Sequence, residues 1–404
     1  MATYPQDGSY VAHLTQITGT VYENVAGIAE VKIRLSSPTV DGPYFWTGSS
    51  WTTTSGDYLT ATIVGGAGQV GISTWTITTG LPSLIDGVTY YIISKSKDEA
   101  GNYETSWSTI SFICDKVGPQ VSIVEPYDAT SLDAEQPRLS SLVTISGTAT
   151  DVGIGQIEEV RWRLKRIRTG NYWDGDGYTS ADYNITEAEK ETAWFVVKTD
   201  EEEQPYSVWY VTHSFLTDER YLVEVRGKDI LGNYSVSYAT ISFTYDANIP
   251  ESAVSFPANG SVVRTISGGI QGTAKDTRSW APGYPGSVSQ IRLAIKRLSD
   301  GYWWEHSPSV DFVQGQQPPG PGPTQGGQTQ VVVIGGTDGN TGSWTYNTIT
   351  DEKLQSGVSY YITVIAEDDA YPNNFEQWYT RGSTFTFDNT PPEVVIQRPP
   401  TTLQ

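Results

Sequence analysis

Aspartates recur at matching places along this chain of 404 residues, and carboxylates arranged in sets can bind cations. One set ends alternating segments in KDEAGN (97–102), KDILGN (228–233) and EDDAYPNN (367–374), and comprises Asp98, Asp229 and Asp368. A second set precedes proline-bearing segments and comprises Asp115, Asp246 and Asp388. Hard cations such as Ca²⁺ bind several carboxylate and carbonyl oxygens at once. The two sets are therefore candidate calcium ligands that would stiffen the links between domains.

The alternative is that these aspartates only close turns. Asp and Asn side chains hydrogen-bond to their own backbone two residues further on, which stabilises a turn without any ion. No dense D-x-D-x-D loop is present, and the densest acidic group is YWDGDGY (172–178). Both interpretations stay open, and calcium is the only cofactor that the sequence raises.

Aromatic pairs offer a second kind of chemistry, because flat rings beside carboxylates can bind sugars. The pairs Phe45-Trp46, Tyr172-Trp173 and Tyr302-Trp303 recur along the chain, and Trp304 follows the last pair. Trp173, Trp303 and Trp304 are therefore candidate ligand-binding residues. Recurrence at the same place also fits packing against the domain or against a neighbouring protein, since apolar patches serve partners as well as ligands.

Other chemistry is disfavoured. The three histidines, His13, His213 and His306, do not lie at metal-ligand spacing with one another or with the single cysteine, Cys114. No nucleotide-binding or nucleophile-elbow motif occurs in a strand-to-helix context. An enzyme needs one distinct constellation of residues, whereas these acids recur in sets. We predict a protein that is not an enzyme.

Charge and hydrophobicity limit the partners. The net charge of −21 disfavours nucleic acid. No run of about 18 apolar residues is present, so we expect no membrane span. The opening MATYPQDGSY lacks the basic start and apolar centre of a signal peptide. Either the protein stays inside the cell, or this is the mature form of an exported one.

The chain repeats itself, and the repeat defines its elements. QITGTV, TISGTA and GIQGTA match around Gly19, Gly147 and Gly272, and are followed by VKIRLSS, VRWRLKRI and IRLAIKRL. Later segments end in STISFICD, ATISFTYD and STFTFD. Each unit thus carries about six or seven short alternating strands separated by Gly, Asn and Asp turns, which is typical of antiparallel two-sheet sandwiches.

These motifs resemble the bacterial immunoglobulin-like and fibronectin type III-like repeats of large extracellular surface proteins. The resemblance covers nearly the whole chain. It implies an extracellular or cell-surface location and a place in stalks, adhesins or structural assemblies, although such sandwiches host many functions. Two features depart from the pattern: the middle loops are long, and the first unit starts late.

The strands that open each domain have prolines at a constant spacing: Pro119 and Pro126, Pro250 and Pro257, Pro392 and Pro399. Pro5 matches the second proline, so we expect the first domain to lack its opening strand. The last copy, which contains Pro392, Val394, Val395, Ile396 and Pro399, opens a domain that does not follow. A sandwich short of an edge strand captures another strand. These residues are candidates for strand donation to the next copy.

We therefore predict an all-β protein of three tandem immunoglobulin-like antiparallel β-sandwiches with an extra C-terminal strand. The expected domains are 1–116, which lacks its first strand, 117–247, and 248–390 with a Pro/Gly-rich loop at 314–328, followed by the orphan strand 391–404. The predicted role is a structural subunit of a filament, sheath or stalk that assembles head-to-tail with itself. The alternative is an adhesin or carbohydrate-binding array, with glycans or surface proteins as partners, cut from a longer protein.

Overall fold

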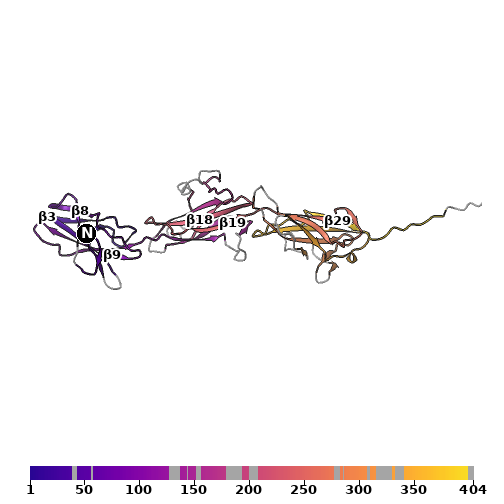
Figure 1. The fold of residues 1–404 in the computed structure, drawn as a ribbon, viewed down its shortest axis with the longest axis horizontal. Coiled ribbons are helices and arrows are strands. Elements are labelled where there is room, and N and C mark those ends of the chain that lie inside the picture. Colours follow the sequence, from indigo (N-terminus) through magenta and orange to yellow (C-terminus); the bar gives the residue numbers. More distant parts are fainter. Residues whose placement is uncertain are drawn as a thin grey trace, which may run out of the picture.

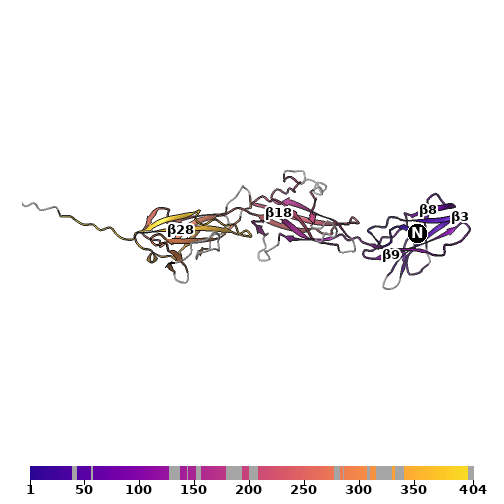
Figure 2. The ribbon, with the colours of Figure 1, turned by 180° about the vertical axis from the view of Figure 1, so that it is seen from behind.

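The computed structural model shows three β-sandwiches in a row, which follow one another along the chain (Figure 1). The view from behind shows the same elongated arrangement (Figure 2). The structure describes all residues except 39–42, 56–57, 127–136, 143, 152–155, 179–192, 200–207, 277–282, 285, 307–309, 315–329, 333–340 and 399–404. No helix among the described residues is long and apolar enough to span a membrane. The protein is all-β, as predicted.

Domain 1 is built on one long strand, β3, which bends through both of its layers. Its strands are β1 (Ala2–Tyr4), β2 (Ser9–Val11), β3 (Ile17–Ser37), β4 (Tyr44–Trp46), β5 (Trp51–Thr52), β6 (Leu59–Thr60), β7 (Thr62–Ile63), β8 (Gln69–Ile77), β9 (Thr89–Asp98) and β10 (Ser108–Cys114). The first half of β3 pairs with β1 and β8, and its second half pairs with β9, β6 and β4. The register between β3 and β8 breaks between Glu23 and Ile28, where β3 passes from one layer to the other.

In domain 2 the two layers are separate sheets, because no single strand among its described residues runs through both of them. Its strands are β11 (Gln120–Glu125), β12 (Arg138–Leu139), β13 (Thr144–Thr150), β14 (Ile157–Arg166), β15 (Phe195–Val196), β16 (Lys198–Thr199), β17 (Val208–Thr212), β18 (Glu219–Asp229) and β19 (Ala239–Tyr245). One sheet has the order β11-β13-β17-β16, and the other β12-β19-β18-β14-β15.

Domain 3 repeats the arrangement of domain 2. Its elements are β20 (Glu251–Phe256), β21 (Ser261–Val263), β22 (Ile270–Lys275), β23 (Val288–Arg297), β24 (Trp303–Glu305), β25 (Asp311–Val313), β26 (Gln330–Val332), β27 (Thr341–Tyr346), the 3₁₀ helix η2 (Asp351–Lys353), β28 (Val358–Asp368) and β29 (Gly382–Phe387). One sheet has the order β20-β22-β27 and the other follows β21-β29-β28-β23-β24-β25, with β26 paired to β23. The predicted loop at 314–328 lies outside the described residues, apart from Gln314.

Each core is centred on a tryptophan that covers a glycine of the neighbouring strand. Gly19, Gly147 and Gly272 pair with Trp75, Trp209 and Trp344. Each indole Nε1–H donates a 3.2 Å hydrogen bond to the carbonyl of the residue after that glycine. These tryptophans are at most 1 % exposed, so only glycine leaves room for the ring. The repeated sequence motifs thus mark the same packing unit three times.

Two expectations about the chain ends need correction. Domain 1 contains a short first strand, β1, whose Ala2 pairs with Gly19 as Ile123 of β11 pairs with Gly147. Met1 to Tyr4 therefore supply the second half of the strand that was expected to be missing. Residues 391–398 form no strand, because no neighbouring strand bonds to their N–H and C=O groups within the described chain. Pro399 lies outside the described residues.

Candidate metal centres at the domain junctions

Three carboxylates from three strands converge where domain 1 meets domain 2. Asp115 follows β10, Asp151 follows β13 and Asp229 ends β18. One oxygen of each lies within 4.8 Å of the others. Asp115 is 3 % exposed and Asp229 is 0 % exposed. Carboxylates this close repel one another unless a cation or protons offset their charge.

Hydrogen bonds hold this first junction in place. Asn233 donates its backbone N–H to Asp229 Oδ1 at 2.8 Å and its side-chain Nδ2–H to Asp229 Oδ2 at 2.7 Å. The same Nδ2 also donates to the Asp115 carbonyl at 3.0 Å, which links the two domains. Asp115 Oδ1 accepts from the Val117 N–H at 3.2 Å, whereas its buried Oδ2 has no hydrogen-bond partner among the described residues. A buried carboxylate oxygen of this kind is a candidate ligand for a cation.

Gly118 makes the close approach of the two domains possible. A Cβ added there would lie 2.4 Å from the carbonyl of Tyr234 in domain 2. Ser235 Oγ donates to the Pro119 carbonyl at 2.5 Å from the same loop. The linker therefore lies against the loop after β18, and it leads directly into β11.

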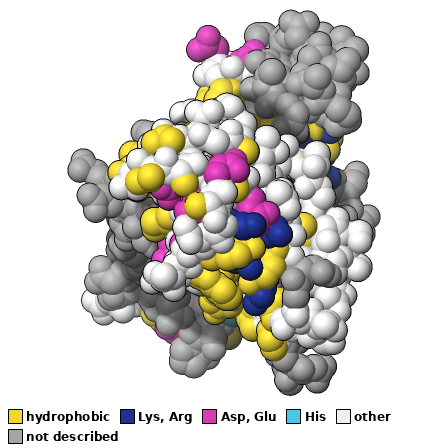
Figure 3. All heavy atoms as spheres, turned by 90° about the vertical axis from the view of Figure 1, so that its left-hand side faces the viewer, with side chains coloured by type: hydrophobic (Ala, Val, Ile, Leu, Met, Phe, Trp, Pro, Cys, Tyr) yellow, Lys and Arg dark blue, Asp and Glu magenta, His cyan; other side chains and the backbone are white. Residues whose placement is uncertain are grey.

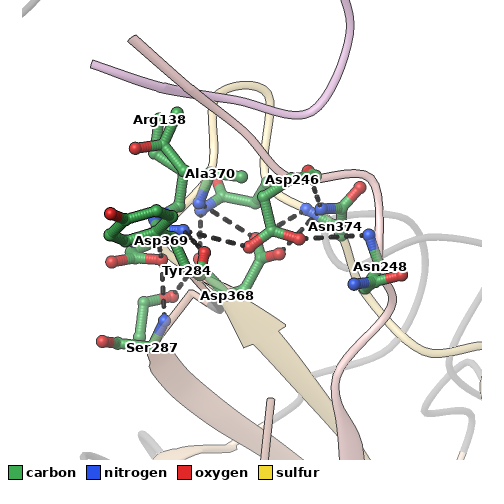
Figure 4. Close-up of polar contacts among 12 residues, drawn as sticks. Arg138, Asp246, Asn248, Tyr284, Ser287, Asp368, Asp369, Ala370 and Asn374 are labelled. Atoms are coloured by element: carbon green, nitrogen blue, oxygen red, sulfur yellow. Dashed lines mark hydrogen bonds and ion pairs between the residues drawn. The ribbon is translucent and has the colours of Figure 1, made fainter. Parts of the chain in front are cut away.

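The second junction repeats this cluster between domains 2 and 3, and Figure 4 shows two of its aspartates, Asp246 and Asp368, with Asn374 beside them. Asp246 follows β19, Asp276 follows β22 and Asp368 ends β28, and one oxygen of each again lies within 4.8 Å of the others. Asn374 donates to Asp368 Oδ2 at 2.7 Å and to the Asp246 carbonyl at 2.9 Å. All three aspartates are buried.

A built-in cation distinguishes the second junction from the first. Arg138 Nη1 lies 3.3 Å from Asp246 Oδ2 and donates to the Tyr284 carbonyl at 2.9 Å. Its Nε lies 3.2 Å from Asp369 of domain 3. The guanidinium thus offsets part of the charge of this cluster and holds the two domains together without an ion.

Burial shifts the protonation of both clusters in the same direction. Desolvation raises the pKa of Asp368 to about 6, and the charge of Asp246 adds to the shift. Desolvation also raises the pKa of Asp246, against the effect of Arg138. The pKa of Asp115 is raised by burial and by the charges of Asp151 and Asp229. Both sites are thus less negative at low pH, and both suit a hard cation at neutral pH.

The structure brings together one predicted aspartate of each set at each junction: Asp115 with Asp229, and Asp246 with Asp368. Asp98 and Asp388, the remaining predicted ligands, lie in domains 1 and 3 and join neither cluster. Sequence reasoning missed Asp151 and Asp276. The available signal was their position four residues after Gly147 and Gly272, where domain 1 has Glu23.

The predicted aromatic residues differ in their surroundings. Lys165 of domain 2 and Lys296 of domain 3 are equivalent residues, and they pair with Tyr172 and Trp303 respectively. Trp303 is therefore the counterpart of Tyr172, and Trp304 is the counterpart of Trp173. Trp303 and Trp304 are 7 % and 2 % exposed and offer little ring surface to a ligand. Trp173 is half-buried beside a groove of about 650 Å³, whose other lining residues include Arg166, Asp176, Tyr178 and His213.

The fold and the junctions define a tandem array of immunoglobulin-like sandwiches with acidic clusters between its domains. No protein-family profile matches this sequence. No curated protein matches it in sequence.

Several solved structures are similar over most of the chain. One is a 1.5-MDa bacterial ice-binding adhesin, 14 % identical, with 92 % of this chain and 90 % of that chain covered and a TM-score of 0.36. Another is a Ca²⁺-stabilized adhesin that helps an Antarctic bacterium bind ice, 13 % identical, with coverage of 92 % and 68 % and a TM-score of 0.30. A third is protocadherin gammaB7 EC3-6, 14 % identical, with coverage of 96 % and 73 % and a TM-score of 0.26.

Proposed function

We propose that this chain is a non-enzymatic structural rod of an extracellular or cell-surface assembly, in which each interior junction binds one Ca²⁺. The observation that carries this proposal is the first junction, where the buried Asp115 Oδ2 lies beside Asp151 and Asp229 and has no hydrogen-bond partner in the part of the chain that the structure describes. The donors are all oxygens, which Ca²⁺ prefers, and backbone carbonyls or water can complete its coordination.

The ligands of each cluster come from two domains, so an ion would act on the linker. At the first junction Asp115 belongs to domain 1, whereas Asp151 and Asp229 belong to domain 2. An ion held by both sides favours the aligned arrangement over every bent one. Binding to the folded state alone also stabilises it, by about 2.7 kcal/mol at a hundredfold excess over the dissociation constant.

Isothermal titration calorimetry of the calcium-stripped chain tests the junction sites. We expect one ion for each cluster, which gives two per chain. Asp115→Asn removes one ligand charge and should abolish one site, and Asp246→Asn should abolish the other. Asp98→Asn is the matched control, because Asp98 makes the same bond to Asn102 but joins no cluster. Unchanged binding by both junction variants would refute the proposal.

A second candidate function is head-to-tail assembly through residues 391–398. Val394, Val395 and Ile396 are 88 %, 80 % and 89 % exposed in an unpaired extended segment. In domain 1, β1 covers only three residues, whereas β11 and β20 each cover six. The part of the β3 edge that β1 leaves uncovered in one copy could pair with the apolar residues 391–398 of another copy, which supports strand addition between copies.

The two outer ends also resemble the two halves of an interior junction. Asp388 Oδ1 accepts from the Thr390 N–H at 3.0 Å, as Asp115 Oδ1 accepts from Val117. Asn102 donates to both oxygens of Asp98, at 2.7 and 2.8 Å, as Asn233 does to Asp229. A second copy could therefore place Asp388 beside Asp98. In the register of β11, Ile396 would take the place of Ala2, so β1 must leave β3 during assembly.

Light scattering of the chain with calcium tests this assembly. Val394→Asp combined with Ile396→Asp should keep the chain monomeric, because two charges cannot be buried in a sandwich core. Val236→Asp is the matched control, since Val236 is 90 % exposed on domain 2. A wild-type chain that stays monomeric, or a double variant that assembles equally well, would contradict strand donation.

A further inference from the structure

Domain 1 gathers its basic side chains on one face, among aromatic rings. Its sequence up to residue 116 contains only Lys32, Arg34, Lys95, Lys97 and Lys116 as basic residues, in a chain with a net charge of −21. Lys32 pairs with Lys95 across β3 and β9, and Arg34 and Lys97 lie on the same side of these strands. Figure 3 looks at the molecule from the domain 1 end and shows Lys and Arg side chains gathered among hydrophobic ones.

Cation–aromatic contacts define this surface, which we call the cationic face. It comprises Arg34, Tyr58, Lys95, Lys97, Tyr103 and Trp107. Lys95 Nζ lies 4.0 Å from the Tyr58 ring centroid, 5.4 Å from that of Tyr103 and 5.6 Å from that of Trp107. Tyr103 and Trp107 are 52 % and 51 % exposed, so both rings retain free surface.

The cations of the cationic face form no ion pair within the described chain, although the Glu30 carboxylate accepts a hydrogen bond from the Tyr103 hydroxyl at 3.5 Å. Lys95 and Lys97 form no ion pair there, and Lys32 pairs only with Glu30 at 3.5 Å. Arg34 donates to the Tyr58 hydroxyl at 2.6 Å, while its buried Nε has no hydrogen-bond partner among the described residues. The ammonium groups of Lys95 and Lys97 are therefore available to an anion.

The same position is closed in the other two domains. In domain 2, Arg163 occupies the place of Arg34, bonds to Glu224 at 2.6 Å and lies 4.5 Å from the ring of the buried Trp194. The residue opposite Arg34 in domain 1 is Ile93, which supplies no charge. In domain 3 the place is taken by Ala294 in an apolar cluster with Trp303, Ile365 and Trp378. If these side chains of domain 1 were only structural, we would expect them to be covered or neutralised, as the equivalent positions are in domains 2 and 3.

We propose that the cationic face of domain 1 binds an acidic saccharide. Lys95 and Lys97 suit carboxylate groups, and the exposed faces of Tyr103 and Trp107 suit the C–H faces of sugar rings. Nucleic acid fits less well, because its dense phosphate charge is repelled by the rest of this acidic chain. This site is independent of the junction ions.

Calorimetry with defined oligosaccharides tests the proposal. The probes are a tetramer of galacturonic acid, its methyl-esterified and hence uncharged form, and an oligothymidylate. We expect the acidic tetramer to bind best, and Lys95→Gln combined with Lys97→Gln to weaken it about tenfold or more. Trp107→Ala should weaken it too, whereas the control Lys165→Gln, which removes a charge from domain 2, should not.

Several outcomes would overturn the proposal. Equal binding of the esterified tetramer would show that charge does not carry recognition, and preference for the oligothymidylate would assign the face to nucleic acid. Absence of binding by every probe, or an unchanged affinity in the lysine double variant, would leave the face without a saccharide role. Thermal unfolding of each variant, which should match that of the wild type, separates lost binding from lost folding.

Discussion

The same side chain acts differently in this molecule according to its burial. Asp98 and Asp368 end equivalent strands, and each is bonded to an asparagine. Asp368 is completely buried and its pKa is raised to about 6, whereas hydrogen bonds from Asn102 lower the pKa of the partly exposed Asp98. What separates them is the neighbouring domain, which covers Asp368 and brings Asp246 beside it. A residue becomes a candidate ligand here through its surroundings rather than through its motif.

His213 provides a pH prediction at this scale. Burial lowers its pKa to about 4, and it lies between Trp173 and Tyr178. An unfolded histidine titrates near pH 6.5. The stability that comes from keeping it neutral is therefore complete above about pH 6.5 and is lost as the pH falls towards 4. We expect wild-type domain 2 to lose more thermal stability between pH 7 and pH 4.5 than a His213→Phe variant does.

Calorimetric melting at both pH values measures this difference. His13→Phe is the control, because it removes an exposed histidine of domain 1. A His213→Phe protein with the same pH dependence as the wild type would show that this histidine is not kept neutral by folding.

At the scale of the elements, the glycine–tryptophan pairs fix how the sheets pack. A Cβ on Gly147 would lie 1.9 Å from the Ser122 carbonyl oxygen and 2.4 Å from the Trp209 ring. Both β11 and the indole would have to move to admit a methyl group. The glycine motif that recurs in the sequence therefore reports a contact between strands.

Gly147→Ala should destabilise domain 2 by about 1–3 kcal/mol through overpacking. Gly268→Ala is the control, because its Cβ would meet only the flexible end of Gln271 at 3.4 Å. Urea unfolding followed by fluorescence measures both changes. A Gly147→Ala variant as stable as the control would mean that the strands separate at little cost.

Sequence patterns placed the main strands better than the chain ends. Alternation and the repeated motifs predicted the long strands of all three sandwiches, because a half-buried strand must alternate. The short strand β1 was not expected, since three residues before a proline carry no periodic signal. Residues 391–398 have the pattern of a strand but pair with no strand among the residues that the structure describes, and a strand forms only by pairing.

At the scale of the whole molecule, the two junctions differ in what links their domains. The first has a glycine linker and an acidic cluster, whereas the second adds Arg138 and its contacts to Asp246 and Asp369. If each junction binds calcium as proposed, removal of calcium should therefore loosen the first junction more than the second. The cationic face is exposed on domain 1, whereas the equivalent position is neutralised in domain 2 and covered by apolar side chains in domain 3.

The sequence by itself determined the fold class and the threefold repeat, because alternation, turn residues and the glycine–tryptophan motifs are local signals. It also identified four of the six clustered aspartates. Only the tertiary structure added Asp151 and Asp276, because the strands they follow come close to β18 and β28 in space, not in sequence. Only the tertiary structure showed that basic side chains of domain 1 stay unpaired with acids among the described residues. Which segments fold over a sheet decides whether its charged side chains are buried or neutralised.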